Sequence, residues 1–225
     1  MIMNTENSYD DLFKTRSKSL RFYISEHDSL GGSRIGGYAP AYFDNDAIIA
    51  ENNLQEYVYY LSIGEDLFPF ISGSEVSIFI PKDFESYNVN DRYPYLPIKC
   101  IFHSPSGRGK NEIICNKDIE SRQLVGKGID NDMEEIDDID EPGNTLLEPV
   151  FGNKIGGTPG LLQKEISYAA RLEEDNYVFV MQFDESSYLQ DQITGNEPFC
   201  HGIIYFYGKF EEGLLIELVG GFWQN

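Results

Sequence analysis

Apolar residues in this chain fall in short runs bounded by polar and turn-forming residues, a pattern that predicts β-strands. Residues 57–63 are almost entirely apolar, which is typical of a strand buried on both faces. Residues 76–80 alternate between apolar and other side chains and end at Pro81, which terminates a strand. The strands predicted in this way cover residues 20–24, 57–63, 76–80, 98–102, 177–183, 201–207 and 214–223, and residues 113–114 and 123–125 are shorter candidates.

Two segments carry a helical pattern instead. Residues 4–21 begin with capping residues and place aspartates early and basic residues late, which is the charge order that a helix dipole favours. In residues 161–172, four apolar positions fall on one helical face, although a pair of short strands also fits. These positions are Leu162, Ile166, Ala169 and Leu172. Residues 45–55 fit either a helix or a loop.

One glycine phrase occurs twice in the chain. Arg-Ile-Gly-Gly at residues 34–37 recurs 120 positions later as Lys-Ile-Gly-Gly at residues 154–157. The buried strand after each phrase keeps the same separation, and the following strand matches at a separation of 127. Repeats of this length indicate duplicated half-domains. We therefore expect two similar subdomains packed about a pseudo-twofold axis.

These patterns predict a single α+β, β-rich domain over residues 1–225, made of mainly antiparallel strands with few short helices. The first copy spans residues 22–103 and the second copy spans residues 147–225. Residues 104–146 have no partner in the repeat, and their composition shifts to Gly, Ser, Asn and acidic residues. We interpret this stretch as an acidic insert that connects the copies.

The insert carries a dense run of carboxylates that we expect to be solvated and to contact a partner. A calcium loop is a second interpretation, because acidic residues alternate at the start of the run. The glycine that such a loop needs at its sixth position is Glu135, which argues against calcium. The eight carboxylates of the run are Asp130, Asp132, Glu134, Glu135, Asp137, Asp138, Asp140 and Glu141.

The net charge of −21 changes the picture most among the global properties. Such a field disfavours binding to nucleic-acid phosphates and to anionic membranes, and it favours basic partners and solubility. The three cysteines show no Cys-x-x-Cys spacing, no secretory signal precedes them, and no apolar run is long enough to span a membrane. We therefore expect a cytoplasmic protein with reduced thiols.

The sequence shows no catalytic constellation. His27, His103 and His201 lack metal-ligand spacing, and Cys200 and His201 point to opposite faces of a strand, so neither activates the other. No Gly-x-Ser-x-Gly motif is present, and the glycine-rich loop at residues 28–40 fits neither nucleotide-binding fingerprint. We expect that loop to be structural, and we expect no cofactor.

The strand at residues 177–183 contains a polar residue that we expect inside the core. Gln182 interrupts an apolar run, so its amide must be hydrogen-bonded internally, and a structural role is favoured over a catalytic one. Asp184 and Glu185 follow at the exit of the strand. They are the best placed of many carboxylates, but pairing any two for acid–base catalysis would be arbitrary.

Three motifs of the second copy together resemble the YwqG-like family of bacterial proteins of unknown function. They are the Lys-Ile-Gly-Gly-Thr-Pro turn at residues 154–159, the strand Val-Phe-Val-Met-Gln-Phe-Asp at residues 178–184, and Gly-Ile-Ile-Tyr-Phe-Tyr at residues 202–207. The first copy matches only the turn strongly, since Ser62 and Gly64 stand where the second copy has its Gln and Asp. The resemblance implies an internally duplicated β-rich domain without an established activity, and it associates relatives with toxin immunity.

Two functions of different classes follow as hypotheses. The first is a non-enzymatic acidic binding protein, in particular an immunity protein that neutralises a basic toxin or another cationic protein. The alternative is a small-ligand-binding protein or an enzyme that uses a cleft between the copies, where Arg34 and Lys154 would meet. The competing interpretation of these two bases is that each forms a salt bridge that holds its own loop. A purely structural homodimer is a third hypothesis, for which the sequence offers no residue.

Overall fold

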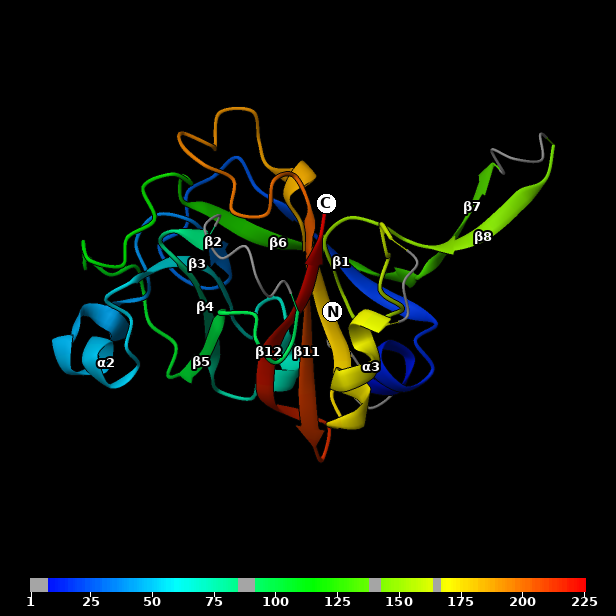
Figure 1. Cartoon of the computed structure of the whole chain (residues 1–225), viewed down its shortest axis with the longest axis horizontal. Coiled ribbons are helices and arrows are strands. Elements are labelled where there is room, and N and C mark those ends of the chain that lie inside the picture. The colour runs from blue at the N-terminus through cyan, green and yellow to red at the C-terminus, as the bar shows by residue number, and fades with distance from the viewer. Residues whose placement is uncertain (1–7, 85–91, 138–142, 164–166) are drawn as a thin grey trace.

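The computed structural model describes residues 8–84, 92–137, 143–163 and 167–225 (Figure 1). The fold is mostly antiparallel β, with few short helices. Ten strands form one continuous sheet that curls into a nearly closed barrel, and two further strands form a separate hairpin. Along the large sheet the strands follow the order β12, β11, β10, β9, β1, β6, β2, β3, β4 and β5.

The strands and helices have the following bounds. The strands of the first part of the chain are β1 (Lys18–Ile24), β2 (Arg34–Ile35), β3 (Tyr57–Ile63), β4 (Glu75–Pro81), β5 (Lys99–His103) and β6 (Arg122–Asn131). The later strands are β7 (Met133–Asp137), β8 (Thr145–Pro149), β9 (Lys154–Ile155), β10 (Val178–Asp184), β11 (Ile203–Glu211) and β12 (Leu214–Gln224). The helices are α2 (Asp46–Glu51), α3 (Ser167–Glu174), a π-helical turn at Asp10–Lys14 and short 3-10 turns at Ala41–Asp44, Pro69–Ile71 and Glu185–Ser187.

Strands β1 and β6 lie side by side at the middle of the sheet. They pair antiparallel, with Tyr23 opposite Val125. On its other edge β1 pairs with β9, and β6 pairs with β2. Strand β1 therefore precedes the first glycine phrase in the chain but pairs with β9, which belongs to the second phrase. Strand β6 precedes the second glycine phrase but pairs with β2, which belongs to the first.

The two outermost strands of the sheet approach each other and nearly close the barrel. The segment that leads into β5 bridges to β12, since the Tyr93 amide donates to the Gly221 carbonyl at 2.5 Å. Gly220 permits this approach, because a Cβ atom there would lie 2.9 Å from Leu96 Cδ2 and 3.1 Å from Ile98 Cβ. The interior is aromatic and aliphatic, and Tyr60 of β3 packs edge-on against Phe183 of β10.

Most predicted strands are confirmed within a few residues. The predicted helix at residues 4–21 is wrong within its described part, because only Asp10–Lys14 forms a helical turn and β1 begins at Lys18. Arg16 adopts a φ of 54°, which ends the turn, and the apolar residues beyond it alternate as a strand requires. The helix predicted at residues 161–172 begins later, as α3.

The predicted insert contains one element that belongs to the body of the fold. Strand β6, which lies within residues 104–146, is a central strand of the large sheet, so this part of the stretch is more than a connection. The short candidate at residues 123–125 is the start of this strand. Within the described part of this stretch, β7 leaves the barrel and pairs with β8 in a separate hairpin (Figure 1).

Candidate functional site

The first candidate site residue, Lys154, is enclosed in the protein interior. Its side chain has no exposed surface, and its Nζ donates to Asp132 Oδ1 at 2.8 Å and to the Thr158 carbonyl at 2.6 Å. Burial lowers the pKa of the Lys154 ammonium, and the contact with Asp132 opposes that shift. These contacts therefore hold in place the loop that contains the second glycine phrase.

Asp132 was expected among the solvated carboxylates, but it is fully buried. Besides the contact with Lys154, it accepts a hydrogen bond from the Thr158 amide at 2.6 Å. Gly157 makes room for it, because a Cβ atom there would lie 2.3 Å from Asp132 Cγ, and the φ of 74° is one that L side chains rarely adopt. Asp132 is thus a structural residue, and we leave it out of any partner-binding surface.

The second base, Arg34, has an analogous place in the first half. Its side chain is fully buried, Nη2 lies 3.1 Å from Glu75 Oε1, and Nη1 donates to the Gly32 carbonyl at 2.6 Å. Burial raises the pKa of the Glu75 carboxyl, and the guanidinium opposes that shift. Each base therefore lies inside its own half, in an ion pair that holds its loop, and neither lines a cleft with the other.

The remaining described carboxylates of the acidic run lie on the hairpin β7–β8 and at its base. Asp130 is exposed at the end of β6, and every residue of β7 is exposed. The hairpin projects from the barrel as an arm, seen at the right of Figure 1. Asp138, Asp140 and Glu141 lie outside the described residues.

Apolar side chains on both faces of this hairpin arm are uncovered. On one face, Ile136, which is 39% exposed, lies opposite Leu146, which is 41% exposed. On the other face are Met133, at 36%, and Leu147, at 62%. An isolated two-stranded hairpin has little stability of its own and leaves strand edges unpaired. The hairpin arm therefore combines carboxylates, exposed apolar groups and edges that pair with no other described strand in one projecting element.

Gln182 is hydrogen-bonded inside the protein, as the sequence pattern indicated, and its partners lie on the Lys154 loop. Its Nε2 donates to the Gly152 carbonyl at 2.9 Å, and its Oε1 accepts from the Gly160 amide at 2.9 Å. The two bonds clamp both ends of the loop onto β10. Position 62 of β3 corresponds to Gln182 in the repeat and carries Ser62, whose hydroxyl takes part in a different network.

A buried chain of hydroxyl groups in the first half contains a Ser–His contact. Ser77 Oγ lies 2.8 Å from both Ser62 Oγ and His103 Nε2, and Tyr59 donates to Ser62 at 2.9 Å. His103 Nδ1 faces the Ser104 carbonyl at 2.9 Å. Burial lowers the pKa of His103 to about 4. The pair resembles a nucleophile with its base, but both side chains are buried, so it serves the core.

Glu185, which the sequence pattern places with Asp184 at the exit of a buried strand, is a buried carboxyl. Its Oε2 accepts from the amides of Phe199 at 3.0 Å and His201 at 3.2 Å, and Tyr188 donates to its Oε1 at 3.3 Å. Burial raises the pKa of Glu185 to about 8, and the charge of nearby Glu197 adds to the shift. No sequence signal marks this burial, because Glu185 stands at a strand exit among other acids.

Among the residues that it describes, the structure shows no further candidate for a catalytic or metal-binding site. Within that part of the chain, no group of three or more His, Cys, Asp or Glu side chains could hold a metal ion. Cys200 and His201 lie in a turn before β11 rather than on the strand, both with positive φ. No described helix is long and apolar enough to cross a membrane.

Comparisons with known proteins leave the assignment to the geometry. No protein-family model matches the chain. No curated protein matches it either. The resemblance to the YwqG-like family therefore stays a prediction from the three motifs.

Proposed function

We propose that this chain is a non-enzymatic, cytoplasmic binding protein that captures a basic protein partner with its hairpin arm. The observation that carries the proposal is the arm itself, which projects from the barrel with uncovered apolar side chains and carboxylates. A binding role explains why apolar side chains of the hairpin arm are exposed to water, and no other feature of the described structure does.

The chemistry of the hairpin arm selects the class of partner. Glu134, Glu135 and Asp137 on β7 and the net charge of −21 favour a cationic surface and speed the encounter with it. Leu147 and Ile136 supply apolar contacts that are released from water on binding. The free strand edges allow a partner strand to add to the hairpin.

The resemblance to the YwqG-like family adds a biological setting to this proposal. In this setting the basic partner is a toxin and the chain is its immunity protein. We also infer that the two halves arose by duplication, with copies at residues 22–103 and 147–225. The mirrored order of strands about β1 and β6 supports this inference, as does the pair of buried bases at matching positions.

A photo-crosslinking experiment tests the proposal. A benzophenone amino acid placed at Leu147 on the hairpin arm is expected to capture one basic protein in the native cell. Leu30, which is 76% exposed in the loop between β1 and β2, is the matched control position and is expected to capture nothing comparable. High salt before irradiation should reduce the product, because salt screens the charges. Equal products from both positions, or no product from Leu147, would count against the proposal.

A further inference from the structure

A cavity of about 220 Å³ lies where the two halves of the chain meet, away from the hairpin arm and from both buried bases. Its floor is apolar and includes Val58, Ile80 and Phe84 of the first half. Pro198 closes it from the second half. At ~30 Å³ per water molecule, the cavity has room for about seven waters, which is the scale of a small organic molecule.

The rim of this cavity carries the carboxylate of Asp118, whose backbone is held by hydrogen bonds. Asp118 lies on a turn whose carbonyl accepts from the Thr194 amide at 2.8 Å, and its own amide donates to Asn116 Oδ1 at 3.1 Å. Gly195 lets the carboxylate lie against the backbone, since a Cβ atom there would be 2.1 Å from Asp118 Oδ1. Asn116 and the second half thus hold the Asp118 backbone, which places one negative charge at the rim.

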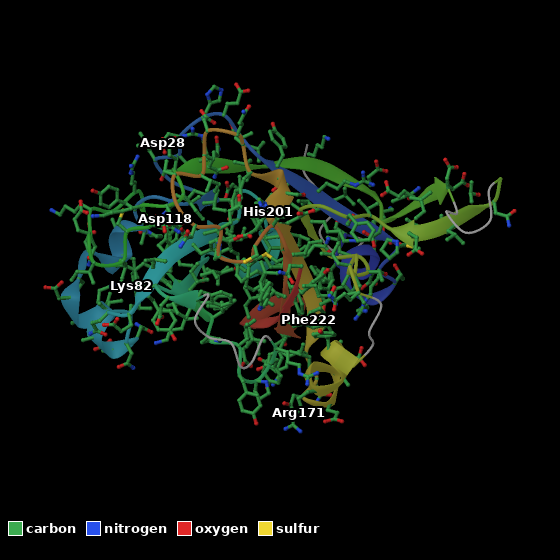
Figure 2. The ribbon with its side chains drawn as sticks, turned by 45° about the horizontal axis from the view of Figure 1, so that its top comes forward. Asp28, Lys82, Asp118, Arg171, His201 and Phe222 are labelled. Carbon is green, nitrogen blue, oxygen red and sulfur yellow. The ribbon has the colours of Figure 1, made fainter. Side chains whose placement is uncertain are left out.

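The balance of charge at the rim is negative. Among the described residues, no basic side chain forms an ion pair with the Asp118 carboxylate. Lys82, the one basic residue of the lining, directs its ammonium to the Gln55 carbonyl. Asp83 adds a second carboxyl group to the rim, and both Lys82 and Asp118 are labelled in Figure 2.

From this geometry we propose that the cavity binds a small organic cation, namely a primary amine attached to an apolar or aromatic body. The amine would donate to Asp118 at the rim, and the body would lie on Phe84 and its apolar neighbours. A charge-assisted hydrogen bond is stronger than a neutral one, and the body would bury apolar surface against the floor of the cavity. This inference is independent of the proposed protein partner, because it uses none of the residues of the hairpin arm.

Titration of the ¹⁵N-labelled chain with tyramine, followed by amide resonances, tests the inference. Tyramine is expected to shift the amides of Asp118 and Asn196, and the neutral analogue 4-ethylphenol is expected to bind about tenfold more weakly or worse. Asp118→Asn should weaken tyramine binding by a similar factor. Asn196→Asp, which adds a carboxylate at the rim, should strengthen it by about threefold.

The outcomes that overturn the inference are specific. Equal affinity for tyramine and 4-ethylphenol would show that the negative charge at the rim does not contribute to binding. Shifts that avoid residues 116–118 and 196–198 would place binding elsewhere, and unchanged affinity in both rim variants would remove Asp118 from the site. Asp118 is exposed, so its replacement leaves the barrel intact, and the Asn196 variant gives a gain that a folding defect cannot imitate.

Discussion

Lys154→Met is expected to lower the free energy of unfolding by about 3–5 kcal/mol, because it leaves the fully buried Asp132 carboxylate without its cation. Methionine retains the apolar stem, so the loss reports the ion pair rather than a cavity. Urea unfolding followed by circular dichroism and by the fluorescence of Trp223 measures it. The same change at exposed Lys127 should cost less than about 0.5 kcal/mol.

A second variant distinguishes a stranded charge from a general packing defect. Lys154→Met combined with Asp132→Asn removes both charges and retains an acceptor for the Thr158 amide. This double variant should recover more than half of the loss, because burying a neutral amide costs less than burying an unpaired carboxylate. A single variant within about 1 kcal/mol of the wild type, or a double variant no better than the single one, would contradict the assigned role.

Glu185→Gln is expected to stabilise the protein at alkaline pH and to leave it nearly unchanged at pH 5. The folded-state pKa of Glu185 is raised from 4.5 to about 8 by burial. The folded protein therefore binds more protons than the unfolded chain across this window, and stability falls as pH rises through it. A shift of this size corresponds to about 3–5 kcal/mol at pH 8.5.

The difference between wild type and variant isolates this effect from other titrations. His103 acts in the opposite sense, since its lowered pKa makes stability rise with pH between about 4 and 6.5, and it is present in both proteins. Glutamine retains an acceptor for the amides of Phe199 and His201, so the comparison preserves these two hydrogen bonds. Parallel curves of unfolding free energy against pH would show that Glu185 is ionised in the folded protein.

The strands could be predicted well from the sequence, because a buried strand has a recognisable local composition. The strand Tyr57–Ile63 and the end of β4 at Pro81 could both be predicted without knowledge of contacts between distant residues. The helix predicted at residues 4–21 was wrong because a favourable charge order is a weak signal beside the burial of alternate residues in β1. The placement of β6 between β1 and β2 could not be predicted, since strand order depends on contacts between distant residues.

The candidate site was predictable in part. The glycine phrases marked Arg34 and Lys154 as special, but their acidic partners, Glu75 and Asp132, carry no local signature of burial. Asp132 in particular stands in a run of carboxylates that are otherwise exposed in the described part of the hairpin. Which member of an acidic run turns inward depends on the turn that Gly157 makes, and this is visible only in three dimensions.

The affinity of the captured basic protein for charge variants of the hairpin arm tests the central claim most directly. Neutralising Glu134, Glu135 and Asp137 should weaken binding by about tenfold at low salt and flatten its salt dependence. Three exposed acids outside the hairpin arm serve as the matched control, neutralised together, and should leave affinity within about twofold. They are Glu26, Glu51 and Glu56. Equal losses in both variants would reduce the interaction to net charge and contradict a binding role for the hairpin arm.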